Sequence, residues 1–278
     1  MSSETSELAR QQELAGRVAI VTGAGRGIGA AIAEEIGSRG AHVIIADLAA
    51  SRALSTAERL QSSGISADAL ELDVSSRASC QNTAAMAIRR HRRLDYLVNN
   101  AGIASYGSVK AMEESSWRSH LDIILTGTFL MTQAVLPFMI EKRAGSIVNI
   151  ASIGGLGGWP LRGAYNASKA GVINLTATLA GELGPFGVRV NCVSPGPIRT
   201  SMAEEAHRTG VASLDKYAAR TPARRLGTTK EIASVVTFLL SDRAAFITGI
   251  NLRVDGGWAA WLNSEGLGYQ ASESSCTA

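Results

Sequence analysis

Residues 17–29 read RVAIVTGAGRGIG: an apolar, β-branched run (17–22) meets a glycine cluster, and apolar positions at helical spacing follow over 27–39. Such a turn lets the backbone approach a pyrophosphate, and the helix N-terminus offers it free N–H groups. A second strand (42–47) then ends on Asp47. This order predicts a dinucleotide site rather than a glycine turn that only packs helix on strand. We expect these residues around the phosphates: Gly23, Arg26, Gly27, Ile28 and Gly29.

Asp47 bears on the choice of nucleotide. A carboxylate here accepts hydrogen bonds from the ribose hydroxyls of NAD and repels the 2′-phosphate of NADP. Arg26 is evidence for NADP instead, because its positive charge favours that phosphate. The residue after Asp47 is Leu48, so the sequence indicates no second cation beside it. Since a carboxylate facing a dianion costs several kcal/mol in a partly buried site, NAD is the expected cofactor.

The strand and helix patterns continue in one rhythm to residue 254. We expect helices at 51–63, 75–91, 113–142, 164–183 and 229–241, and strands at 67–72, 94–99, 145–151, 188–193 and 250–254. Strands that alternate with helices imply right-handed crossovers, and nearly continuous apolar strands are covered on both faces. The predicted fold class is α/β: a doubly wound parallel sheet in a Rossmann-like three-layer sandwich. No linker interrupts 16–257, so we predict one domain (14–258) between a polar N-terminal extension (1–13) and a tail (259–278).

Composition and charge exclude several classes of protein. The chain of 278 residues is 46% hydrophobic with a net charge of +3, which is typical of a globular domain. The basic run 89–93 is expected at a helix end, where cations suit the helix dipole, and not as a nucleic-acid site. The charge-free stretch 123–140 contains Pro137 and several polar residues, so it predicts a buried helix and no membrane span. Three scattered cysteines indicate no disulfide framework and no metal site, and they suit the cytoplasm.

A tyrosine and a lysine open the helix expected at 164–183. Residues 165–169 read YNASK, so Tyr165 and Lys169 stand one turn apart on one face. A free tyrosine has a pKa of about 10 and is a poor base at neutral pH, but a nearby ammonium stabilises the phenolate. The pair then becomes a general acid/base for a hydroxyl or carbonyl oxygen. Ser152 follows the preceding strand and is expected to hydrogen-bond that oxygen.

These motifs together resemble the short-chain dehydrogenase/reductase family over about residues 14–258. Its further marks are Asp73-Val74, the segment 99–102 (NNAG), Pro195-Gly196 and the segment 254–257 (VDGG). The resemblance implies that Asp73 and Val74 hold the adenine and that Lys169 also grips the nicotinamide ribose. It implies a carboxamide contact from the Ile198 backbone and the Thr200 hydroxyl, and tetrameric assembly. The remaining cofactor-binding residues that it implies are Asn100, Ala101, Gly102, Tyr165, Pro195 and Gly196.

One position departs from the family pattern. The family has an asparagine in the helix before the fifth strand, where it holds a water that passes the proton from the lysine to solvent. Here residues 123–127 read IILTG, and Ile124 stands at that point. An isoleucine cannot hold the water, so the proton needs another route.

The expected function is hydride transfer between NAD(H) and a secondary alcohol or ketone. The segment 153–164 carries little charge and includes Leu156, Trp159 and Leu161, and by family analogy it lines the substrate pocket together with the loop around Met202. An apolar or cyclic substrate is therefore expected. Two alternatives stay open: a 3-oxoacyl-carrier-protein reductase that docks an acidic carrier on 89–93, and a nucleotide-binding scaffold that has lost turnover. The charge-free helix stretches 123–140 and 170–181 predict a homo-oligomer, because a helix covering a sheet in a monomer needs a polar outer face.

Overall fold

The computed structural model describes residues 12–260 of the chain, and within them seven strands form one parallel sheet. The order is β3-β2-β1-β4-β5-β6-β7, so the chain first adds strands on one side of β1 and then, from β4 on, on the other side. The strands are β1 (Val18–Thr22), β2 (His42–Asp47), β3 (Ala67–Glu71), β4 (Tyr96–Asn99), β5 (Gly145–Ile150), β6 (Val188–Pro195) and β7 (Asn251–Val254).

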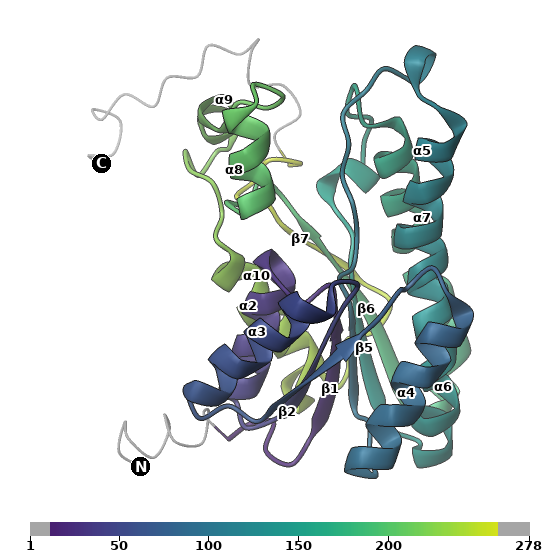
Figure 1. Cartoon of the computed structure of the whole chain (residues 1–278). Coiled ribbons are helices and arrows are strands. Elements are labelled where there is room, and N and C mark those ends of the chain that lie inside the picture. The colour runs from purple at the N-terminus through teal and green to yellow at the C-terminus, as the bar shows by residue number, and fades with distance from the viewer. Residues whose placement is uncertain (1–11, 261–278) are drawn as a thin grey trace, which may run out of the picture.

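Helices cover both faces of the sheet, which is why its strands are apolar on both sides. One face packs against α2 (Gly27–Ser38), α3 (Ala50–Ser62) and α10 (Thr229–Leu240). The other packs against α4 (Arg77–His91), α6 (Gly127–Lys142) and α7 (Gly163–Leu183). Figure 1 shows the two groups on opposite sides of the strands. The predicted doubly wound, three-layer architecture is confirmed. The expected extension and tail lie almost wholly outside the described residues.

The single helix expected at 113–142 is in fact three pieces. It consists of α5 (Glu114–His120), a π-helical turn η2 (Leu121–Thr126) and α6. Ile124 lies inside the π turn, and its carbonyl accepts a hydrogen bond from the Thr128 hydroxyl at 2.7 Å. A π turn inserts one extra residue per turn, and the apolar pattern does not reveal it.

Two helices between β6 and α10 were not expected, namely α8 (Ser201–Arg208) and α9 (Leu214–Arg220). No residue of α8 is buried, and Leu214 is the one buried residue of α9. Because the two helices stand beyond the sheet (Figure 1) and are only 8 and 7 residues long, their few apolar residues do not give the long periodic pattern by which a core helix is found in a sequence. Their first turns are instead capped by the hydroxyls of Thr200 and Ser213.

The stretch Glu114–Lys142 is long and apolar enough to cross a membrane by length and composition alone. Its α6 part, however, buries Met131, Val135 and Met139 against the sheet. This packing is typical of the core helix of a globular protein, and it favours the expectation that no membrane is spanned.

Candidate active site

A cleft of about 770 Å³ opens at the carboxyl ends of the strands. It lies where the strand order reverses, because it is lined both by residues that follow β1 and β2 and by residues that follow β4, β5 and β6. In open α/β sheets this crevice is where ligands bind. The geometry of the fold therefore brings the motifs of distant segments to one place.

The glycine turn after β1 is shaped by close backbone contacts on one side and open space on the other. Gly23 has φ +61°, and a Cβ there would lie 2.8 Å from Ala101 Cα. A Cβ on Gly29 would run into the carbonyl of Gly23. Gly27 also has φ +61° but meets nothing within 4 Å, so its backbone is bare towards the cleft that it lines. A pyrophosphate fits this cradle at the N-terminus of α2.

Asn100 holds the glycine turn against β4. Its amide Nδ2 donates to the carbonyls of Thr22 at 2.9 Å and Gly23 at 3.1 Å. In return, the Thr22 hydroxyl accepts from the backbone N–H groups of Asn100 and Ala101, each at 3.0 Å. Asn100 therefore acts by positioning the backbone of the cradle.

Asp47 ends β2 at the cleft and is only 6% exposed. Its Oδ2 accepts from Gly25 N–H at 3.0 Å, and its Oδ1 accepts from Ala49 N–H at 3.0 Å. Arg52, in the first turn of α3, also donates to Oδ1 at 3.0 Å. The interpretation that no second cation stands beside Asp47 is therefore wrong. The sequence did not reveal Arg52, because only the turn from β2 into α3 brings it within reach of the carboxylate.

The structure brings the predicted cofactor residues into this one cleft, with a single exception. Gly29 does not line it but packs beneath the turn, where it lets α2 approach β1 closely. The residues that line the cleft are Gly23, Arg26, Gly27, Ile28, Asp47, Asp73, Val74, Asn100, Ala101, Gly102, Pro195, Gly196, Ile198 and Thr200.

The three predicted catalytic residues also line the cleft, on its β5 and α7 wall. Ser152 follows β5, and its Oγ accepts from Gly154 N–H at 3.0 Å, which fixes the hydroxyl. Tyr165 lies in the first turn of α7. Lys169, one turn later, is 5% exposed and has its Nζ 5.7 Å from the centre of the Tyr165 ring. That Nζ donates to the Ile150 carbonyl at 2.6 Å, so β5 and α7 together position the ammonium.

Ile124 fills an apolar space behind this wall. It is 1% exposed and packs with Ala151, Val172 and Cys192. Ile124 and Lys169 border the same glycine, because a Cβ built on Gly102 would lie 3.7 Å from Ile124 Cγ1 and 3.8 Å from Lys169 Nζ. The family asparagine is thus replaced by packing, with the lysine close by.

The substrate side of the cleft includes residues that sequence reasoning missed. Trp159 and Met202 line it as expected, whereas the expected Leu156 and Leu161 do not. Tyr106 and Tyr217 line it without having been predicted, and Arg162 belongs to the expected segment 153–164 but was not singled out in it. They sit in segments without helical or strand periodicity or in the unexpected α9, and only proximity to Tyr165 in the chain singles out Arg162.

An aromatic cluster ties this side together. The rings of Trp159 and Trp258 stack with centroids 5.4 Å apart, and Tyr217 meets both edge-on at 5.6 Å and 5.9 Å. Aromatic pairs at these separations add stability beyond their area burial. The loop before α7, helix α9 and the turn after β7 are thereby fixed to one another.

Comparisons with known proteins agree with this geometry. The family model described as enoyl-(acyl carrier protein) reductase matches residues 23–259. Trans-4-hydroxycyclohexanecarboxylate dehydrogenase of Sinomonas cyclohexanicum is 41% identical over 90% of this chain and 95% of its own length. The 3-oxoacyl-(acyl-carrier-protein) reductase FabG of Thermotoga maritima is 37% identical over 88% and 98%. The crystal structure of gox2181 superimposes with a TM-score of 0.87 at 38% identity, over 91% of this chain and 99% of that one. By this similarity the chain belongs to the short-chain dehydrogenase/reductase family, whose members use a nicotinamide cofactor for oxidoreduction.

Proposed function

We propose that the protein transfers a hydride between NAD(H) and a secondary alcohol or ketone of apolar or cyclic character. The observation that carries this proposal is the wall of the cleft formed by Ser152, Tyr165 and Lys169, set beside the glycine cradle. Ser152 can polarise the substrate oxygen, Tyr165 can exchange its proton, and Lys169 supplies a fixed positive charge. A protein that only bound nucleotide would have no use for this set.

Each residue has a distinct part in the proposed chemistry. NAD, when bound, supplies the hydride acceptor. The Tyr165 phenolate removes the proton of the alcohol, and in the reverse direction the Tyr165 hydroxyl gives a proton to the oxygen of the ketone as it is reduced. Lys169 stabilises the phenolate form by its charge, and its ammonium is held at the Ile150 carbonyl, 2.6 Å away. The Ser152 hydroxyl, with its oxygen accepting from Gly154, is free to donate its proton to the substrate oxygen.

The choice of NAD rests on Asp47. Both of its carboxylate oxygens already accept backbone N–H bonds, so the charge is held at the end of β2. Arg52 neutralises part of that charge but stays bound to it, and Arg26 is the remaining cation that favours NADP. A carboxylate fixed in this position weighs more against a 2′-phosphate than one exposed arginine weighs for it.

The apolar or cyclic substrate follows from the lining of the cleft beyond Tyr165. Trp159, Met202, Val211 and Tyr217 offer rings and alkyl groups there. The relative from Sinomonas, whose name gives a hydroxycyclohexanecarboxylate as its substrate, supports a ring alcohol for this chain as well.

The carrier-protein reductase is the second candidate, favoured by the similarity to FabG. Two observations weigh against it. Asp47 disfavours NADP, and the basic run 89–93 ends α4 beside His42, the first residue of β2, at the sheet edge opposite the cleft. Arg90 and Arg93 are moreover paired with Asp68 and Asp95. A carrier docked on this run would lie at the amino end of β2, whereas Tyr165 lines the cleft at the carboxyl ends of the strands.

We propose further that the protein is a cytoplasmic homotetramer. The outward residues of α6 include Phe129, Gln133 and Pro137, and those of α7 include Ala170 and Asn174. None of these carries a charge. Such faces suit burial against a second copy of the chain.

Tyr165→Phe tests the assignment of the acid/base group. The variant should bind NADH with nearly unchanged affinity, because the ring stays in place. Its kcat should fall by about 10²–10⁴-fold, the usual contribution of a general acid/base. Initial rates of NADH formation across a panel of secondary alcohols measure kcat, and fluorescence titration measures NADH binding. A variant that keeps more than about a tenth of the wild-type rate contradicts the assignment.

A further inference from the structure

Arg162 is a cation on the substrate side of the cleft. It stands directly before α7, three positions ahead of Tyr165. Its guanidinium carbon lies 4.1 Å from the centre of the Tyr106 ring, 5.2 Å from that of Trp159 and 5.6 Å from that of Tyr165. Its Nη2 donates to the Tyr106 hydroxyl. The charge is therefore stacked among aromatic rings at the place where the substrate meets the catalytic tyrosine.

No carboxylate neutralises this arginine among residues 12–260. Its Nε is buried without a hydrogen-bond partner. Burial lowers the pKa of Arg162, and the ionisable side chains that act on it are the phenols of Tyr165 and Tyr217. Removing a charge from water without pairing it is costly, so a buried, half-satisfied guanidinium is normally completed by an anion.

The backbone holds Arg162 in place before any ligand binds. Leu161, the preceding residue, has the left-handed φ of +65°, and its carbonyl accepts from Gly107 N–H at 2.9 Å. Gly107 and Arg162 form a parallel bridge. The segments on either side of the cleft mouth are thus joined, and the arginine is preorganised.

We infer that Arg162 binds an anionic group of the substrate, a carboxylate, while the alcohol of the same molecule reaches Tyr165. This inference rests on the proposed function and narrows its substrate class to hydroxy acids with an apolar spacer. A guanidinium presents paired N–H donors that match a carboxylate. The guanidinium carbon lies 5.6 Å from the centre of the Tyr165 ring, so one small hydroxy acid can contact both residues. The relative from Sinomonas suggests a six-membered ring as the spacer to be tested.

The test compares 4-hydroxycyclohexanecarboxylate with its methyl ester, which keeps the ring and the alcohol but lacks the charge. The readout is the ratio of the two kcat/KM values in wild type and in Arg162→Met, Arg162→Lys and Arg220→Met. Arg220 is the matched control, because it lies over Trp258 in the same aromatic cluster but does not line the cleft. We expect wild type and Arg220→Met to favour the acid by tenfold or more, about 1.4 kcal/mol. The ratio should fall to near one in Arg162→Met and stay partly raised in Arg162→Lys.

Failure of this inference and failure of the proposed function give different results. A wild type that oxidises both compounds at equal kcat/KM, or a preference that survives in Arg162→Met, overturns the role of Arg162. A wild type that oxidises neither compound nor any other secondary alcohol overturns the proposed function. If Arg162→Met folds poorly, competitive inhibition by cyclohexanecarboxylate and by its amide is compared in wild type and Arg162→Lys. A larger loss of inhibition for the carboxylate supports the inference, and equal loss for both contradicts it.

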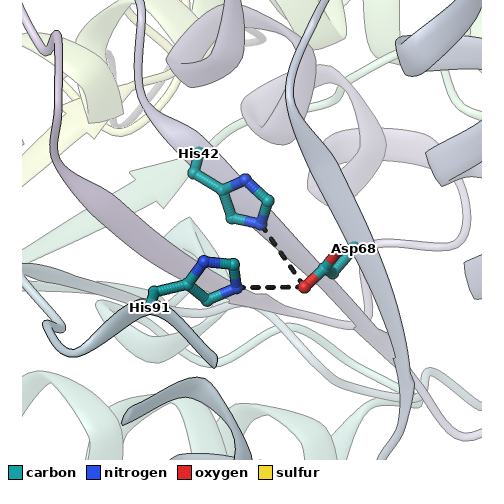
Figure 2. A group of neighbouring side chains, drawn as sticks. All are labelled: His42, Asp68 and His91. Carbon is teal, nitrogen blue, oxygen red and sulfur yellow. Dashed lines mark hydrogen bonds and ion pairs between the residues drawn. The ribbon is translucent and has the colours of Figure 1, made fainter. Parts of the chain in front are cut away.

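A second cluster of titratable groups lies far from this cleft, at the opposite edge of the sheet. Figure 2 shows His42, the first residue of β2, and His91, the last of α4, both turned towards Asp68 of β3. Oδ2 of Asp68 is 3.0 Å from Nε2 of His91 and 3.5 Å from Nε2 of His42. No sequence motif marks these residues, because three separate elements supply them.

We propose that His42, Asp68 and His91 bind a divalent transition-metal ion such as Zn²⁺. Their ligand atoms all lie within 4.8 Å of one another, and two imidazoles with one carboxylate are a common set for such ions. Nε2 of His42 is buried and has no hydrogen-bond partner, while its Nδ1 is 2.7 Å from the Ser66 hydroxyl. A hydrogen bond at the second nitrogen orients a metal-binding imidazole.

The surroundings of the cluster leave room for a metal ion with one coordination position open to water. The three side chains are 19–28% exposed, so water reaches the site. Arg90 Nη1 lies 3.4 Å from the same Asp68 oxygen and competes for it. Because that side chain is 46% exposed, it can turn to solvent when a metal ion binds.

Titration of the full chain with Co²⁺ and Zn²⁺ tests this site. Cys276→Ser is the background, because Cys80 and Cys192 are buried and Cys276 is the remaining cysteine of the sequence. We expect one Co²⁺ per chain, with a visible absorption band and a Kd of about 10 μM or below. His42→Ala and His91→Ala should each weaken binding tenfold or more, and Arg90→Gln should tighten it. The control His207→Ala, on exposed α8, should leave the affinity unchanged. No saturable binding, or binding that persists in both His42→Ala and His91→Ala, overturns the proposal, and circular dichroism checks that each variant is folded.

Discussion

Restoring the family residue by Ile124→Asn probes how the proton leaves the site. Ile124 is 1% exposed and packs with Val172 and Cys192, so an amide placed there enters an apolar space. The Ile124 backbone carbonyl is already bonded to the Thr128 hydroxyl and offers no ready partner. We expect the wild type to be active and its proton to leave Lys169 by a water route that uses backbone carbonyls.

The expected effects can be given magnitudes. A buried amide without partners costs about 1–3 kcal/mol. In a chain of this size that lowers Tm by about 2–12 °C. The change in kcat should be about tenfold or less, or about 1.4 kcal/mol of barrier, because the asparagine acts through water one step from the chemistry. Ile124→Val is the matched control: it removes one methylene for about 0.5–1.5 kcal/mol and adds no polar group.

The assay follows oxidation of one good alcohol by all three proteins, with Tm measured by circular dichroism. An asparagine that lowers Tm more than valine does, with kcat within tenfold of wild type, supports the water route. A wild type that is silent on every alcohol, beside a briskly active Ile124→Asn, shows instead that the chain is a disabled enzyme of the same fold. That outcome would also refute the proposed function.

Three further predictions concern the choice of cofactor, the oligomeric state and the pH dependence of stability. Asp47→Ala should narrow or invert the preference for NAD over NADP, because Arg26 and the released Arg52 then face the 2′-phosphate. The values of kcat/KM for both cofactors measure this preference, and a wild type that prefers NADP contradicts the role given to Asp47. Light scattering should find a tetramer at micromolar concentration, and a 29.0 kDa particle would exclude it. Burial works to raise the pKa of Asp95, but hydrogen bonds from Arg93 and Lys142 outweigh it and lower that pKa. Asp95 therefore stabilises the fold above its unfolded pKa, and this contribution is lost as the pH falls through the lower folded value, so Asp95→Asn should cost about 1–3 kcal/mol at pH 7 and progressively less below about pH 4 in urea unfolding.

The fold could be predicted because its decisive signals are local. The run from β1 into the glycine turn, and the apolar strands that follow, depend on residues adjacent in the chain. The same holds for Tyr165 and Lys169, which one helical turn brings together. The π turn around Ile124 has no such signal, since one extra residue in a turn leaves the apolar pattern nearly unchanged.

Contacts between segments account for what the sequence did not reveal. Arg52 reaches Asp47 only because β2 turns sharply into α3. Arg162 meets Tyr106 because the loop before α7 pairs with the segment after β4. Helices α8 and α9 bury almost nothing in the core, so their apolar residues follow the cleft and not a sheet face. The Arg52 contact thus depends on the geometry of a turn, and the Arg162 contact on a partner 56 residues away in the sequence.

The two halves of the cleft are therefore built differently. The cofactor cradle and the Ser152–Lys169 wall are set by buried strands and by α2 and α7, so changes there disturb the core as well as the site. The substrate side is set by the 156–162 loop, α8 and α9, which contribute few buried residues. Substitutions on the two sides should be close to additive except at Arg162, which stacks on Tyr165 and so belongs to both. A double-mutant cycle of Arg162→Lys with Met202→Leu, compared with Arg162→Lys and Ser152→Ala, would locate that coupling on the catalytic side.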